Sequence, residues 1–311
     1  MQPLTIAAIA GPTASGKSAL ALQLHAAGLP VEIVNFDALQ VYRGLDAGTA
    51  KPSAAERAQL PMHLLDLLEP HEAMTAGRWA ATARPLLAEI VARGHLPLLV
   101  GGTGLYLRAL LRGLAPIPPI EPQLRAELER QFAERGPDAL HAELTKLDPD
   151  YAAATPPANR QRVLRALEVA LGTGKAFSQW HREHQAQPAG FRGLVAVLEP
   201  QRPWLLARID RRAAAMAQPL LAEVAQLLEN GIDPTAPGMQ ALGYRDAAAV
   251  VLGQASRDGF ADRLALAHRQ YAKRQQTWFA AEPANLRLDP AACEPLSPLF
   301  AALQAHFTAA T

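Results

Sequence analysis

The sequence is poor in cysteine, with only Cys293 among 311 residues. A single thiol excludes an internal disulfide framework and a cysteine-ligated metal centre, and it fits a reducing, cytoplasmic location. The chain also lacks a signal segment and an apolar run of membrane-spanning length, so we expect no membrane partner. Neither sign of charge is in excess, because the formal net charge is +1. Bulk charge therefore does not indicate a nucleic-acid partner.

Lysine is scarce as well, since only five of the 30 basic residues are lysine and the others are arginine. Arginine binds phosphate and stacks on bases, which weakly favours RNA or phosphate contacts. A GC-rich genome would also raise the arginine content and accounts for most of the bias. Half of the residues are apolar, enough for a sizeable core, and the length predicts one large or two modest domains.

The clearest motif is Gly11-Pro12-Thr13-Ala14-Ser15-Gly16-Lys17-Ser18, which matches the phosphate loop G-x-x-x-x-G-K-[ST] at every fixed position. An apolar run over 4–10 predicts a buried strand before it, and 18–24 predicts a helix after it. In that setting the loop amides and the positive end of the helix face a bound phosphate. Lys17 adds a point charge, and Ser18 offers a hydroxyl to Mg²⁺. The motif predicts polyphosphate binding without identifying the polyphosphate.

Strand and helix patterns alternate through the first third of the chain. Strands are predicted at 31–35, 63–66 and 96–100, and helices at 76–93 and 105–111. This alternation predicts a phosphate-loop α/β fold with a doubly wound parallel sheet.

The pattern changes after a linker punctuated by Pro116, Pro118, Pro119 and Pro122. Helical periodicity without a strand continues to about Glu183, which predicts a helical insertion over 115–190. The α/β core is expected to comprise 1–114 and 191–311, with helices over 202–229 and 262–279 and strands over 194–198 and 286–288.

Two strand ends carry candidate site residues. Asp37 follows the strand over 31–35, and ligands of parallel sheets bind at the carboxyl ends of strands. Asp37 can hold Mg²⁺, act as a base or cap a helix, and the sequence leaves these alternatives open. Gly101-Gly102-Thr103-Gly104 follows another strand, where the backbone can approach a ligand or simply form a tight turn.

Several arginines share predicted helix faces. Arg208 and Arg212 are four residues apart and can clamp a diphosphate, whereas Arg211 is expected to point elsewhere. Arg162 and Arg165 form a second pair, and a third basic cluster lies near Tyr271 and Trp278 and comprises Arg269, Lys273 and Arg274. Basic and aromatic residues together suit RNA, although each cluster alone is more typical of an ordinary solvated helix surface.

Taken together, six stretches resemble the tRNA dimethylallyltransferase (tRNA isopentenyltransferase) family. They occur in the order of that family, cover nearly the whole chain and read GPTASGKSALAL from Gly11, FDALQVYRGLDAGTAKP from Phe36, LPLLVGGTGLYLRALLRGLAPIP from Leu96, QRVLRALEV from Gln161, ALGYRD from Ala241 and RQYAKRQQTWF from Arg269. The stretches from Phe36 are much more specific than the phosphate loop alone.

The resemblance implies transfer of a dimethylallyl group from dimethylallyl diphosphate to the N6 amine of the adenosine adjacent to the anticodon in tRNA. It implies Mg²⁺ as cofactor, a helical insertion that binds the anticodon stem-loop, Asp37 as general base and Thr103 as a catalytic contact to the nucleotide. Arg212 joins residues 11–18 as a diphosphate ligand, and a monomer is expected. The implied tRNA contacts are Asp37, Ala38, Leu39, Gln40, Thr103, Arg125, Gln161, Arg162, Val163, Leu164, Arg165, Gln240, Ala241, Leu242, Gly243, Tyr244 and Arg245.

The chain departs from the family pattern in three places. Ala38 stands where serine is usual, Asn35 and Phe36 stand where smaller residues are common, and Gln218-Pro219-Leu220 replaces a glycine-containing turn. An ATP-dependent phosphotransferase or NTPase is the main alternative. It requires an acidic residue at the end of an apolar strand, for which Asp66 is the candidate. A non-catalytic RNA-binding module is a further alternative, but it would not need Lys17 and Asp37 in one cleft.

Overall fold

The structure is a computed structural model that describes residues 4–184, 190–291 and 296–308, so Cys293 lies outside the described residues. The chain divides into two compact units, one made of 1–111 with 188–311 and the other of Arg112–Gln187. None of the described helices is both long and apolar enough to cross a membrane.

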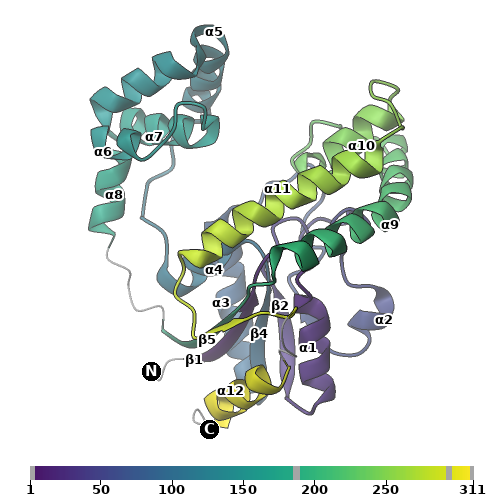
Figure 1. Cartoon of the computed structure of the whole chain (residues 1–311). Coiled ribbons are helices and arrows are strands. Elements are labelled where there is room, and N and C mark those ends of the chain that lie inside the picture. Colours follow the sequence, from purple (N-terminus) through teal and green to yellow (C-terminus); the bar gives the residue numbers. More distant parts are fainter. Residues whose placement is uncertain (1–3, 185–189, 292–295, 309–311) are drawn as a thin grey trace. The chain divides into compact units, whose positions relative to one another are not determined.

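The first unit is built on a parallel sheet of six strands in the order β3-β2-β4-β1-β5-β6 (Figure 1). This confirms the predicted phosphate-loop α/β class, and the predicted strands over 194–198 and 286–288 lie in the sheet. The strands are β1 (Leu4–Ala10), β2 (Val31–Asn35), β3 (Met62–His63), β4 (Leu96–Gly101), β5 (Phe191–Leu198) and β6 (Leu286–Leu288). The third strand is shorter than predicted because Leu64 and Asp66 have φ angles of 60° and 54°, which an extended strand does not accommodate.

Side chains of β1 alternate between two hydrophobic cores, as the two-residue period of a strand requires. Ile6 and Ala8 belong to the core on one face, together with residues of α3 (Ala76–Ala92), α4 (Gly104–Arg112), α9 (Arg202–Glu229), α10 (Tyr244–Val251) and α11 (Phe260–Ala280). Ala7 and Ile9 belong to the core on the other face, which α1 (Lys17–Ala26) and α12 (Leu296–Thr308) cover. Both faces of the sheet are therefore buried, and ligand access is left to its edges and ends.

The predicted helices of this unit agree with the structure where the apolar pattern extends over several helical turns. The predicted helices over 76–93, 105–111, 202–229 and 262–279 are confirmed within two residues at each end, whereas α10 and α12 were not predicted. The helices are α1 (Lys17–Ala26), α2 (Ala54–Arg57), α3 (Ala76–Ala92), α4 (Gly104–Arg112), α9 (Arg202–Glu229), α10 (Tyr244–Val251), α11 (Phe260–Ala280) and α12 (Leu296–Thr308).

The second unit contains helices and no strand among its described residues. These helices are α5 (Pro122–Leu147), α6 (Pro149–Ala153), α7 (Arg160–Thr173) and α8 (Phe177–Glu183). Within α5, Gly136 adopts φ 80° and ψ 170° immediately before Pro137 and kinks the helix. Val163 and Leu164 of α7 are fully buried in the core of this unit. An apolar core therefore encloses both side chains, and the tRNA contact of the stretch 161–165 stays a prediction.

Candidate active site

The carboxyl ends of three neighbouring strands meet at one edge of the sheet. The register pairs Ala10 of β1 with Gly101 of β4, and Asn35 of β2 with Val100 of β4. The phosphate loop after β1, Asp37 after β2 and the glycine-rich turn after β4 therefore begin at the same level. A cavity of about 570 Å³ opens there, lined by Lys17, Ser18 and Asp37 together with residues of α9 and α11. The structure thus brings the two predicted strand ends together.

The phosphate loop has the backbone that its glycines permit. Gly11 has φ 145°, and a Cβ there would lie 2.8 Å from the carbonyl oxygen of Leu198, so no other residue fits. Gly16 has φ 97° and leads directly into α1. The positive end of that helix therefore lies at the loop. Ser15 is buried, and its Oγ has no hydrogen-bond partner within the described part of the chain.

The ammonium group of Lys17 is held over the loop, where Nζ donates to the carbonyl oxygen of Pro12 at 2.7 Å. Desolvation lowers the pKa of Lys17 to about 8; the charge of Asp37 opposes this shift, and that of Arg212 adds to it. An anion in the cavity would stabilise the charged form of Lys17. The arrangement is that of a phosphate site in a low-dielectric cavity.

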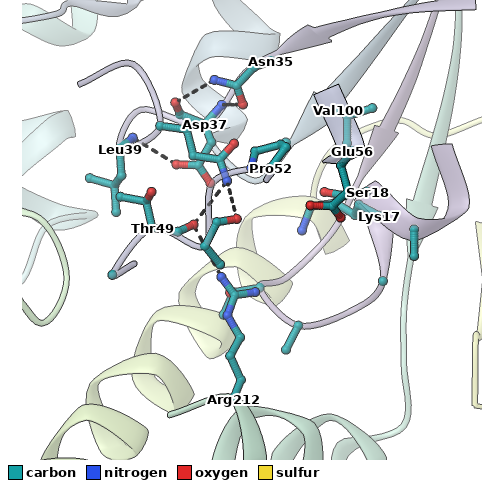
Figure 2. A pocket seen from close by; sticks show the side chains of 18 of the residues that line it. Lys17, Ser18, Asn35, Asp37, Leu39, Thr49, Pro52, Glu56, Val100 and Arg212 are labelled. Carbon is teal, nitrogen blue, oxygen red and sulfur yellow. Dashed lines mark hydrogen bonds between the residues drawn. The ribbon is translucent and has the colours of Figure 1, made fainter. Parts of the chain in front are cut away.

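Asp37 is held by its neighbours and begins no helix. Asn35 accepts from the Asp37 N–H at 3.1 Å and donates Nδ2 to the carbonyl oxygens of Asp37 and Leu64. The carboxylate accepts from the Leu39 N–H at 3.0 Å, which forms an Asx turn (Figure 2). The alternative of a helix N-cap is therefore wrong, because residues 38–41 form bends and turns. The buried Asn35 side chain thus holds the backbone of Asp37, a role that was not predicted from the sequence.

Thr103 and Gln275 tie the strand ends to one another. Thr103 Oγ1 accepts from the Ala38 N–H at 2.9 Å and hydrogen-bonds to Tyr271. Gln275 of α11 accepts from the Thr13 N–H at 2.8 Å and donates to the Gly102 carbonyl oxygen at 3.0 Å. A Cβ on Gly102 would lie 2.1 Å from that amide nitrogen, so a side chain there would displace the Gln275 amide. Thr103 thus orients the chain after Asp37, while Gln275 clamps the phosphate loop.

Helix α9 contributes the arginines of the cavity. Arg208 Nε donates to the carbonyl oxygen of Ala14 at 2.8 Å, and the Arg212 guanidinium reaches the carbonyl oxygen of Thr49 at 3.5 Å (Figure 2). Burial lowers the pKa of Arg212, and its Nε has no hydrogen-bond partner among the described residues. Arg211 also lines the cavity, so the expectation that it points elsewhere is wrong. Three cationic groups of one helix therefore line the cavity that contains the phosphate loop.

A hydrogen-bond network shapes the loop that carries Thr49. Glu223 accepts from the N–H groups of Asp46 and Ala47 at 2.8 and 2.7 Å, and it accepts from the Tyr244 hydroxyl at 2.5 Å. That hydroxyl also accepts from the Gly48 N–H at 3.2 Å. Tyr244 is fully buried in this arrangement. The side chain therefore packs inside the core, and the expected contact of this residue with tRNA stays a prediction.

The remaining residues of 240–245 differ in exposure. Ala241 is buried at 3% exposure, and its contact with tRNA stays a prediction. Leu242 lines the cavity, whereas Gln240 and Arg245 are exposed.

Removing the Tyr244 hydroxyl should destabilise the protein. In Tyr244→Phe, Gly48 loses its acceptor and Glu223 loses a donor inside the protein, which costs about 1–3 kcal/mol. Urea denaturation measures the change in the free energy of unfolding. The matched variants are Glu223→Gln and the double variant, whose destabilisation should differ from the sum of the two single effects by about 0.5–3 kcal/mol. Simple additivity would contradict the network.

Two cavity residues of α11, His268 and Gln275, were not predicted as site residues, and Tyr271 was predicted only as an aromatic neighbour of the basic cluster. His268, Tyr271 and Gln275 line the cavity at spacings i, i+3 and i+7, so they share one helix face. The sequence contains this spacing, but the prediction used the basic residues that lie between them on a different face of the helix.

Asp66 does not occupy the position that the phosphotransferase alternative requires. Its Oδ1 contacts the buried Lys51 Nζ at 2.6 Å, and its Oδ2 contacts Arg57 at 2.6 Å. Lys51 also pairs with Asp46 at 2.5 Å. The Asp66 carboxylate is thus committed to structural ion pairs. No group of three or more His, Cys, Asp or Glu side chains that could hold a metal ion occurs in the described ranges.

A parallel sheet with a phosphate loop, a carboxylate on the next strand end and a wall of arginines defines a phosphate-loop α/β protein with a transferase-type site. The model of the IPP transferase family matches residues 40–282. The chain therefore belongs to the IPP transferase family. The matched part begins just after Asp37 and does not include the phosphate loop.

Two curated relatives extend the match along the chain. The tRNA dimethylallyltransferase of Anaeromyxobacter sp. strain K is 47% identical over 279 residues, which cover 90% of this chain and 91% of the relative. That of Methylibium petroleiphilum is 49% identical over 287 residues, covering 88% of this chain and 86% of the relative.

Two solved structures share the fold. The tRNA isopentenylpyrophosphate transferase of Bacillus halodurans has a TM-score of 0.72 at 33% identity, covering 98% of this chain and 97% of that chain. A eukaryotic dimethylallyltransferase acting on tRNA has a TM-score of 0.77 at 28% identity, covering 97% and 77%.

Proposed function

We propose that this chain transfers a dimethylallyl group from dimethylallyl diphosphate to the N6 amine of the adenosine adjacent to the anticodon in tRNA, releasing diphosphate. The observation that carries the proposal is a single cavity lined by the phosphate-loop Lys17, Arg212 and the carboxylate of Asp37. Relatives of similar length are named for this activity.

The cationic wall suits a leaving diphosphate. In the reaction the bond between C1 of the dimethylallyl group and the diphosphate oxygen breaks, and the electron pair stays on that oxygen. Lys17 Nζ, the loop amides and the Arg212 guanidinium are donors placed to stabilise this charge. The low dielectric that lowers the pKa of Lys17 also strengthens its attraction to the anion.

Asp37 suits the other half of the reaction. The N6 amine forms a bond to C1 and must lose a proton, which the carboxylate accepts. The Asx turn and Asn35 hold Asp37 in place, and their hydrogen bonds use only one of its two carboxylate oxygens. The target base must leave its stack to reach the cavity.

Magnesium fits the residues present. Mg²⁺ commonly takes one or two protein ligands and completes its shell with substrate phosphates and water. The Ser18 hydroxyl lines the cavity together with Asp37 and Glu56. Ser18 would hold the ion, which would supply charge neutralisation for the diphosphate when bound. The Glu56 carboxylate is already used in the capping box of α2.

The second unit is assigned to the tRNA anticodon stem-loop. Gln161 and Arg162 of α7 are exposed, while Arg165 and Arg125 are half-buried and contact the carboxylate of Glu168 at 3.1 and 3.8 Å. Arginines at these positions can bind RNA phosphates and stack on bases.

Binding to tRNA should weaken steeply with salt. If about four phosphates are contacted, the logarithm of the binding constant should fall against the logarithm of salt concentration with a slope near roughly −3 to −4. The double variant Arg162→Ala/Arg165→Ala should flatten this slope, measured by filter binding over a salt series. Arg130→Ala, which removes an arginine bound to Glu127 and Glu134 on α5, is the matched control. An unchanged slope in the double variant would assign both arginines to an ordinary surface.

The direct test is mass spectrometry of tRNA after incubation with the full chain and dimethylallyl diphosphate. One adenosine beside the anticodon should gain the mass of one dimethylallyl group in place of one hydrogen, and diphosphate should appear in equal amount. ATP in place of dimethylallyl diphosphate should give neither product. Phosphate release or transfer from ATP without prenylation would overturn the proposal.

A further inference from the structure

His268 of α11 is a buried histidine for which the fold provides no hydrogen-bond partner. The residue is only 4% exposed. Neither Nδ1 nor Nε2 has a partner within the described ranges of the chain. Buried polar groups are normally hydrogen-bonded, and His268 lines the cavity that contains Lys17 and Asp37. A ligand in that cavity is therefore the natural partner of the imidazole.

The surroundings of His268 favour an anion. Helix α9 presents Arg208, Arg211 and Arg212 to the same cavity, and α1 presents Lys17. The Nε of Arg212 is a second buried donor without a partner among the described residues. Two unused donor groups, one on α9 and one on α11, thus border the phosphate site. The loop after β2 presents Asp37, α2 presents Glu56, and α11 adds the Tyr271 hydroxyl.

We propose that His268 is a further diphosphate-binding side chain of this site, which donates a ring N–H to a phosphate oxygen beside Arg212. The identity of the anion rests on the proposed function, whereas the donor role rests on the burial and position of the imidazole. The phosphate loop and Arg212 alone would leave His268 unsatisfied in both the free and the bound protein. With diphosphate bound, the ring N–H of His268 and the Nε–H of Arg212 each gain a hydrogen-bond acceptor.

A proton should accompany the ligand. Desolvation and, next to it, the charge of Arg212 lower the pKa of His268 to about 4 in the free protein. The imidazole is therefore neutral at pH 7 and carries one N–H. A bound diphosphate adds negative charge beside it and raises its pKa. Between the free and the bound pKa, binding takes up a proton, and the contribution of His268 to affinity grows as the pH falls.

Nuclear magnetic resonance of the full chain with labelled histidine measures this pKa directly. The His268 signal is the one missing in His268→Gln. Its titration midpoint is expected near 4 without ligand. With saturating inorganic diphosphate the midpoint should rise by about one pH unit or more. An unmoved midpoint, while other signals report bound diphosphate, would overturn the role of His268 and leave the proposed function intact. Complete absence of diphosphate binding would overturn both.

Variants test the donor role independently by calorimetric titration with inorganic diphosphate. His268→Phe should weaken binding about ten-fold, the usual loss for one hydrogen bond to a charged group. His268→Gln keeps a donor and should stay within about three-fold of wild type, without the proton uptake. His71→Phe replaces an exposed histidine and should change neither quantity. Equal affinity and equal proton uptake in His268→Phe and wild type would contradict the proposal.

Discussion

Replacing Asp37 by asparagine should slow the chemical step of prenyl transfer by roughly 10²- to 10⁴-fold, the range expected for loss of a general base. Asparagine keeps the shape and one acceptor oxygen, so the Asx turn to the Leu39 N–H can persist. Folding and dimethylallyl diphosphate affinity should therefore change little. Single-turnover transfer to tRNA, measured with saturating enzyme, isolates the step.

A magnesium series separates the two roles that remain for Asp37. If the carboxylate binds Mg²⁺, the lost rate should return in part at high Mg²⁺; if it is the base, the deficit should persist. Asp262→Asn is the matched control, because Asp262 is exposed in the first turn of α11. A near-wild-type rate for Asp37→Asn at ordinary Mg²⁺ would remove the base from the mechanism and assign proton removal to water.

Replacing Lys17 by alanine should reduce dimethylallyl diphosphate affinity about 10- to 100-fold, the equivalent of one strong charge-assisted contact. The ammonium group lies over the phosphate loop, whereas the arginines assigned to RNA lie on α5 and α7. Affinity for tRNA should therefore hold. Calorimetry with the diphosphate and filter binding with tRNA measure the two affinities, and Lys146→Ala removes an exposed lysine as the control. Equal loss of both affinities would show that the two sites are wrongly placed.

The lowered pKa of Lys17 also predicts that the affinity for diphosphate depends on pH. The pKa of Lys17 is lowered to about 8 in the free protein, so the ammonium form dominates below pH 8 and is lost above it. The terminal phosphate of the ligand is already ionised there, because its second pKa is about 6. Diphosphate affinity should therefore fall as the pH rises through 8. In Lys17→Arg the guanidinium stays charged, and the decline should disappear. A decline of equal size in Lys17→Arg would assign the titration to another group.

Much of the α/β core was predictable from local chemistry. The apolar runs at 4–10 and 31–35 became buried strands with the predicted bounds. The phosphate loop was predictable because glycine is required at Gly11 and Gly16, and few other structures place Gly-Lys-Ser at the start of a helix. Parallel strands then dictate that Asp37 lies at the same edge as that loop.

Helices α10 and α12 and the short β3 were not predictable in the same way. The predicted strand over 63–66 overlaps β3 only at His63. Tertiary contacts decided the outcome there, because the ion pairs of Asp66 with Lys51 and Arg57 stabilise a left-handed backbone that ends the strand after His63.

By itself the sequence determined the fold class, the phosphate site and the placement of Asp37 at the ligand edge, because each follows from residues close together in the chain. The tertiary structure alone decided which distant side chains complete the site. Gln275 meets Thr13 across 262 positions, and Glu223 meets Ala47 across 176. It also decided that Tyr244 and Val163 are interior residues and that His268 faces the cavity. Burial and long-range hydrogen bonding depend on how helices pack on the sheet, and no local pattern encodes them.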